Sequence, residues 1–82
     1  MRIISRLAEH LDLMSQMFAR TGAAEQFAQS AGENGLKQAI FQCAACKDTD
    51  ECKQWLANAE QGAQSPEFCR NSQTIERLAA MR

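Results

Sequence analysis

Four cysteines are the residues of this 82-residue chain whose type and spacing favour a chemical role. Cys43, Cys46, Cys52 and Cys69 follow the pattern C-x2-C-x5-C-x16-C. Thiolates bind zinc and iron–sulfur clusters, and they are the nucleophiles of disulfide exchange. Single buried cysteines often only pack in a core. Four of them within 27 residues of a short chain instead favour one shared site.

The spacing favours a bound metal over a disulfide framework. The N-terminal sequence MRIISRLAEHLDLM has neither an export signal nor a long apolar stretch, so we expect the cytoplasm, where thiols stay reduced. Only one C-x2-C unit is present, on a predicted helix, whereas zinc fingers and ribbons commonly use two such units on β-turns. Iron–sulfur clusters accept four cysteines at unequal spacing. We therefore expect a [4Fe–4S] cluster on all four cysteines, with zinc as the alternative and a thiol–disulfide redox protein as a third hypothesis.

Helices are predicted to position these cysteines, because apolar residues recur at i, i+3 and i+4 and no segment alternates with period two. Gly22 is expected to end the first helix, and residues 32–35 to form a turn. The sequence predicts an all-α fold, a small bundle of four to five short helices around a four-cysteine site. We expect one domain over residues 1–82, with the site region at 36–82. The expected helices cover residues 3–20, 23–30, 36–46, 50–60 and 72–81.

The predicted helix boundaries bring the cysteines together. Cys43 and Cys46 share a face near one helix end, and Cys52 falls in the first turn of the next helix. Ser65-Pro66 is typical of a helix start, which puts Cys69 in a first turn as well. The partial positive charge of a helix start lowers the pKa of a thiol there. The expected apolar shell consists of Ile40, Phe41, Trp55, Leu56 and Phe68.

Three further residues are of interest. Asn71 either donates a side-chain hydrogen bond to a cysteine sulfur or caps the last helix, and Trp55 is expected in the core. His10, on the apolar face of the first helix, is expected to be partly buried and hydrogen-bonded, outside the site. That wide face is expected to pack in the core, and it can also dock a partner protein or a second copy of the chain. It includes Met14, Met17 and Phe18.

The composition bears on the expected partners, on enzymatic activity and on the size of the core. Nine basic and ten acidic residues are interspersed, giving a net charge of −1, so we expect no nucleic-acid partner and no membrane partner. One histidine and no nucleotide-binding glycine pattern make an enzyme the less favoured reading. With one Trp, four Phe and no Tyr, the core is expected to be thin and to need a metal or a partner for stability.

Two resemblances bear on the site. The stretch Cys43-x2-Cys46-x5-Cys52 resembles the last three cysteines of the cluster loop C-x6-C-x2-C-x5-C in DNA glycosylases of the endonuclease III type. Their fourth cysteine lies upstream, whereas here it lies downstream, so DNA repair does not carry over. The resemblance implies only that helical scaffolds can use this spacing.

The second resemblance runs through essentially the whole chain. The amphipathic first helix and three cysteine motifs resemble a proteobacterial family of short helical four-cysteine proteins classed as a domain of unknown function. The motifs are Cys43-x2-Cys46, Cys52-x2-Trp55-Leu56 and Pro66-x-Phe68-Cys69-x-Asn71. This resemblance implies the architecture and no activity. We expect an iron–sulfur protein for electron transfer or for sensing redox state, oxygen or iron, with a zinc-stabilised protein-interaction module as the alternative.

Overall fold

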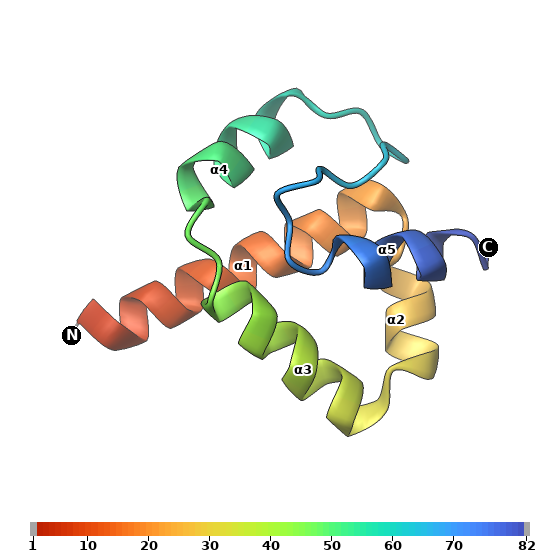
Figure 1. Cartoon of the computed structure of the whole chain (residues 1–82), viewed down its shortest axis with the longest axis horizontal. Helices are drawn as coiled ribbons and strands as arrows, with labels where there is room; N and C mark the ends of the chain where they lie inside the picture. Colours follow the sequence, from red (N-terminus) through yellow and green to blue (C-terminus); the bar gives the residue numbers. More distant parts are fainter. Residues whose placement is uncertain (1, 82) are drawn as a thin grey trace.

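The computed structural model of the chain describes residues 2–81, with side chains from residue 8 onward. Over these residues the chain forms helices and turns and contains no strand, which confirms the predicted all-α class (Figure 1). The helices are α1 (Arg2–Thr21), α2 (Ala24–Ser30), α3 (Gly32–Ala44), α4 (Thr49–Asn58) and α5 (Ser72–Ala79). No helix in this part of the chain is long and apolar enough to cross a lipid bilayer.

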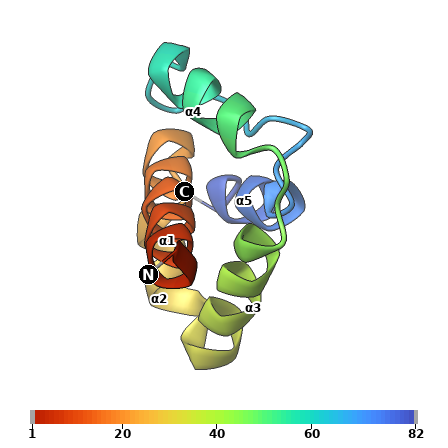
Figure 2. The ribbon, with the colours of Figure 1, turned by 90° about the vertical axis from the view of Figure 1, so that its left-hand side faces the viewer.

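Helix α1 is the centre of the arrangement and contacts each of the other four helices. In Figure 1 it crosses the molecule between α4 and α3, and Figure 2 shows α5 and α3 beside it and α4 above it. The molecule measures 39 × 30 × 16 Å. Along this shortest dimension the helices form two layers, with α1 and α2 in one and α3 and α5 in the other (Figure 2). The core between the layers is small, as the composition predicted.

The end of α1 follows from Gly22, as predicted. This glycine has a φ of 82°, and its N–H donates to the carbonyl of Ala19 (3.2 Å) while the Ala23 N–H donates to that of Phe18 (2.9 Å). These two bonds form a Schellman motif, which needs a residue in the left-handed conformation. The chain reverses there, so that Phe27 of α2 packs on Phe18 with ring centroids 4.5 Å apart.

The core joins α1 to α5. Ile75 is fully buried, and Leu56 and Leu78 are also buried. Trp55 is half-buried and packs against this core. The buried core cluster consists of Met17, Phe18, Ala23, Ala39, Ile75 and Leu78.

The predicted turn at residues 32–35 is wrong. These residues form the first turn of α3, and only Ala31 separates α3 from α2. Gly32 alone changes the direction of the chain. Its φ of 67° is in the left-handed region, which glycine adopts without strain. Gly35 lies inside the helix, where an added Cβ would come within 2.8 Å of the Ala31 Cβ. The residue between the two helices therefore lies close against the start of α3.

The predicted helix start at Ser65-Pro66 is also wrong. Residues 66–71 form turns, and α5 begins only at Ser72. The Ser65 hydroxyl pairs with the hydroxyl of Ser72 at 2.8 Å, so it is not a helix cap. This hydrogen bond closes the long connection between α4 and α5 against the start of α5.

Candidate metal centre

The cysteines come from three segments around α1. Cys43 lies in the last turn of α3, and Cys46 lies just after that helix, with its N–H bonded to the Cys43 carbonyl (3.0 Å). Cys52 is in the first turn of α4, as predicted, with its N–H on the Asp48 carbonyl (2.9 Å). Cys69 was expected in a helix but lies in a turn three residues before α5.

All four cysteines border one cavity of about 30 Å³. By volume it has room for about two water molecules. Residues distant in sequence therefore meet here, because the connection from α4 to α5 returns across α1 (Figure 1). The other lining residues are Leu13, Met14, Met17, Phe68, Arg70 and Asn71.

Apart from the cysteines, most of the apolar wall of this cavity comes from α1, whose apolar face was expected in the core or against a partner. Of the expected apolar shell, only Phe68 lines the cavity, and Phe41 is 76% exposed on α3. Leu13 and Met17 lie one turn apart on α1, and Met14 lies beside them. The apolar face of α1 was visible in the sequence, but its position opposite the cysteines was not.

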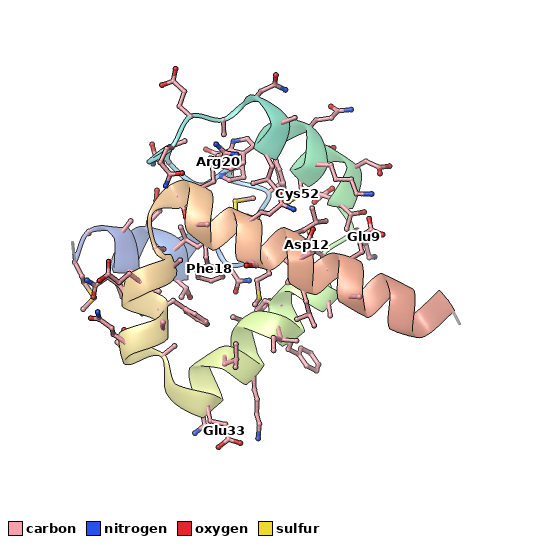
Figure 3. All side chains as sticks on the ribbon, turned by 180° about the vertical axis from the view of Figure 1, so that it is seen from behind. Glu9, Asp12, Phe18, Arg20, Glu33 and Cys52 are labelled. Atoms are coloured by element: carbon pink, nitrogen blue, oxygen red, sulfur yellow. The ribbon has the colours of Figure 1, made fainter. Side chains whose placement is uncertain are left out.

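An ion pair on the surface links α1 to α4, the helix that carries Cys52. Lys53 of α4 pairs with Glu9 of α1, and Figure 3 shows Glu9 beside Asp12 on the part of α1 that faces α4. Leu56 adds an apolar contact, since it is buried one turn beyond Cys52.

The thiols are free and half-buried. Among the described residues, no three His, Cys, Asp or Glu side chains lie close enough together to hold a metal ion. In a tetrahedral zinc site with Zn–S bonds of about 2.3 Å, the sulfurs are about 3.8 Å apart. The cysteines thus share a space, while the metal centre itself stays a prediction.

His10 and Cys43 are joined by a reciprocal pair of hydrogen bonds. The Cys43 thiol donates to the His10 carbonyl (3.1 Å), and His10 Nδ1 lies 2.7 Å from the Cys43 carbonyl. Because a carbonyl only accepts, Nδ1 carries the proton. The predicted half-buried, hydrogen-bonded histidine is confirmed, but it lies against the candidate site. No spacing in the sequence indicates this contact across 33 residues.

Two other sulfurs accept backbone hydrogen bonds. The Asp48 N–H lies 3.4 Å from Cys46 Sγ, and the Asn71 N–H bonds to Cys69 Sγ. Backbone donors of this kind stabilise negative charge on sulfur, and in iron–sulfur proteins they tune the potential. Both donors come from the residue two positions after the cysteine, so the local turns create them.

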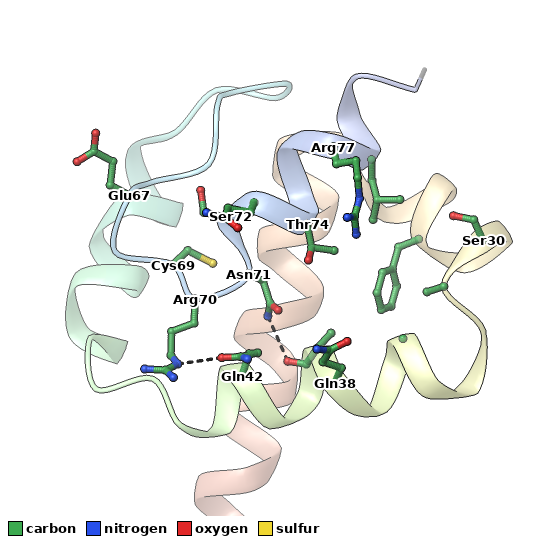
Figure 4. Close-up of a pocket in the computed structure, with 16 residues that line it drawn as sticks. Ser30, Gln38, Gln42, Glu67, Cys69, Arg70, Asn71, Ser72, Thr74 and Arg77 are labelled. Carbon is green, nitrogen blue, oxygen red and sulfur yellow. Dashed lines mark hydrogen bonds between the residues drawn. The ribbon is translucent and has the colours of Figure 1, made fainter.

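The side chain of Asn71 does neither of the things that we expected. Its Nδ2 donates to the Ala39 carbonyl of α3 at 3.1 Å (Figure 4), and it forms no cap on α5. Asn71 is only 6% exposed. It therefore ties the turn that carries Cys69 to the middle of α3.

Burial sets the protonation of the thiols. It raises the pKa of Cys43 and Cys52 to about 11, and the neighbouring thiols add to the shift. Burial also raises the pKa of Cys69, although the Asn71 N–H opposes it. The expectation that helix starts lower the pKa of Cys52 and Cys69 is wrong, because burial raises the pKa of both thiols and Cys69 lies before the start of α5.

Protonated thiols are poor nucleophiles. With a pKa of about 11, Cys43 and Cys52 are thiolates in only about one molecule in 10⁴ at pH 7. Such thiols are poorly suited to disulfide exchange, but a metal ion can displace their protons.

Fold and site together define a small all-helical protein whose four free cysteines border one cavity. Residues 1–81 match the model of a family of unknown function, DUF6455, and the chain belongs to this family. No curated protein and no solved structure matches the chain.

Proposed function

We propose that the chain is a small iron–sulfur protein in which Cys43, Cys46, Cys52 and Cys69 ligate one [4Fe–4S] cluster. The observation that carries the proposal is that all four cysteines border the same cavity. The cluster would pass single electrons or report redox state, oxygen or iron to a partner.

The donor set fits such a cluster. Four cysteines at unequal spacing supply one thiolate for each iron, and no histidine or carboxylate lines the cavity. Leu13, Met14, Met17 and Phe68 give the cavity apolar walls, which suit a water-sensitive centre. The backbone N–H groups of Asp48 and Asn71 already point at sulfur.

The residues around the cavity must open to admit a cluster, because its inorganic core separates the four cysteine sulfurs. Cys43 now donates to a backbone carbonyl and Cys46 accepts from a backbone N–H. Rotation of these two thiols would break both bonds and turn the sulfurs toward the cavity, and the segments that carry the cysteines would then have to move apart. A bound cluster supplies reversible one-electron transfer, while this chain supplies four thiolates and an apolar enclosure.

A zinc-stabilised interaction module is the second candidate, favoured by the small volume of the cavity, about 30 Å³. A single ion needs the sulfurs drawn together, to about 3.8 Å from one another, and needs no enlargement. Zinc would then stabilise a fold only 16 Å thick in its shortest dimension.

The test is the content of iron, sulfide and zinc in protein purified without oxygen. Four irons and four sulfides per chain are expected, with loss of the cluster in each single Cys→Ser variant. Ala45→Ser is the control, because it adds a hydroxyl at an exposed position between Cys43 and Cys46. One zinc per chain instead would support the second candidate, and a folded, metal-free protein would refute both.

We also propose that a partner protein or a second copy of the chain docks on the N-terminal helix. Met17 and Phe18 are buried in the chain's own core and Met14 packs against it, so these residues do not form an open face. Docking would therefore use the part of α1 that extends beyond α3 in Figure 1. Light scattering of the metal-loaded protein tests for a dimer, and a monomer at all concentrations would leave a different protein as the only partner.

A further inference from the structure

A second and much larger cavity lies next to the cysteines. It is a groove of about 990 Å³ between α3 and α5, closed at one end by α2 (Figure 4). Its volume is in the range of small-molecule sites, about 300–1,000 Å³. Residues Cys69, Arg70 and Asn71 line both this groove and the cysteine cavity, so they form the wall between the two spaces.

The groove is positively charged on a chain whose net charge is −1. Its charged lining residues are Arg70, Arg77 and Glu67. Figure 4 shows Glu67 at the rim, pointing away from the groove, while Arg77 extends from α5 into the groove. The groove therefore favours an anion.

Most of the side-chain hydrogen-bond donors that line the groove have no partner in the part of the protein that the structure describes. The Arg77 side chain makes no ion pair or hydrogen bond within the described part of the chain. Arg70 donates only its Nε, to Gln42 Oε1 at 3.1 Å, which leaves both of its Nη groups available. Gln38 of α3 and Thr74 of α5 line opposite walls and likewise have no partner among the described residues.

Donors arranged in this way suit a phosphate group better than a carboxylate. A phosphate presents three oxygens in different directions, so it can accept from both walls at once, whereas a carboxylate is planar. Arginine binds phosphate oxygens in pairs through its planar fork. Thr74 and Gln38 add neutral donors that do not compete for the charge.

We propose that this groove binds a small molecule through its phosphate group, with Arg77 as the charged contact and Thr74 and Gln38 as neutral ones; Arg70 lies at the other end of the groove, beside Gln42. The ligand would lie against the segment that carries Cys69. The site is independent of the metal centre, so its test does not depend on which metal, if any, the cysteines hold.

The test is calorimetric titration of the full chain, as purified, with inorganic pyrophosphate at constant ionic strength. We expect saturable binding of one ligand per chain, weakened about tenfold or more by Arg77→Gln, which removes a charge-assisted contact. Thr74→Val should weaken binding less. Arg20→Gln is the matched control, because Arg20 lies on α1 and lines a different part of the surface.

Binding that survives Arg77→Gln, or that falls equally in Arg20→Gln, would overturn the proposal, as would the absence of saturable binding. Circular dichroism of each variant verifies the fold, which the exposed position of Arg77 should leave intact. A nucleoside diphosphate and a sugar phosphate are then titrated in the same way. Tighter binding of either one than of pyrophosphate would show which kind of molecule carries the phosphate.

Discussion

Replacing Asn71 with alanine tests how the turn that carries Cys69 is held. The side chain is buried, and its Nδ2 donates to the Ala39 carbonyl 32 positions away. Asn71→Ala removes this tie between the turn and α3, while the backbone N–H that bonds to Cys69 Sγ remains. The variant should therefore loosen the segment without removing any thiol.

The expected loss follows from two contributions. A hydrogen bond of this kind contributes about 0.5–1.5 kcal/mol net, and the space left by the side chain adds a fraction of a core truncation. The Ala39 carbonyl keeps its helical partner inside α3, so it is not left unpaired. We expect a total loss of about 1–2 kcal/mol, and each kcal/mol lowers the Tm of a domain of this size by about 4–8 °C.

Urea unfolding followed by the fluorescence of Trp55 measures this loss. Asn58→Ala is the matched control, because Asn58 Nδ2 also donates to a backbone carbonyl, that of Gln54 at 2.8 Å, but at an exposed position. The control should lose less than about 0.5 kcal/mol. Equal losses in the two variants would refute the view that Asn71 holds the Cys69 turn in place.

Three further predictions concern protonation and packing. In metal-free, reduced protein, alkylation of Cys43 and Cys52 should be slow at about pH 8 and rise until the pH reaches about 11, since only the thiolate reacts; half-maximal rates near pH 8.5, as for free cysteine, would contradict the effect of burial. The Lys53 ammonium hydrogen-bonds to the Glu9 carboxylate and lowers its pKa, so this pair stabilises the fold above the ordinary pKa of Glu9 and stops doing so as the pH falls through the lowered one. Lys53→Met should return the Glu9 pKa, followed by NMR, to its ordinary value, and an unchanged pKa would contradict the pairing. Ile75→Ala should cost about 2–5 kcal/mol in urea unfolding, because Ile75 is 0% exposed; a loss below about 1 kcal/mol would show that the site is not packed as described.

The helices were predictable where local signals agreed. The period of apolar residues predicted α1 to within a residue or two, and Gly22 ended it through the expected left-handed conformation. The start of α4 was also predictable, because Asp50 and Glu51 suit the first turn of a helix. These signals act over a few residues and need no knowledge of the rest of the fold.

Two predictions about where helices begin were wrong, because the residue types alone do not show which contacts or backbone angles the folded chain adopts. Ser65-Pro66 is typical of a helix start, yet the Ser65 hydroxyl finds a partner in Ser72, and the chain between them forms turns. Residues 32–35 contain two glycines, which suggested a turn, but one left-handed glycine was enough to separate α2 from α3.

For the candidate site, the sequence supplied the residues but not their surroundings. Spacing indicated that Cys43, Cys46, Cys52 and Cys69 belong together, and all four border one cavity. Burial raises the pKa of Cys43 and Cys52, whereas a lowered pKa was expected for thiols at helix starts. The depth of burial depends on packing that the spacing of the cysteines does not encode. The contact of His10 with Cys43 likewise depends on how α3 crosses α1.

The most direct test of a shared four-cysteine centre is a native mass spectrum of the chain prepared without oxygen. We expect a single species heavier than the polypeptide by four irons and four sulfides, which reverts to the bare chain mass on acid unfolding. A native mass equal to that of the polypeptide with four reduced thiols would contradict the account, because the cysteines would then share a cavity without holding a metal.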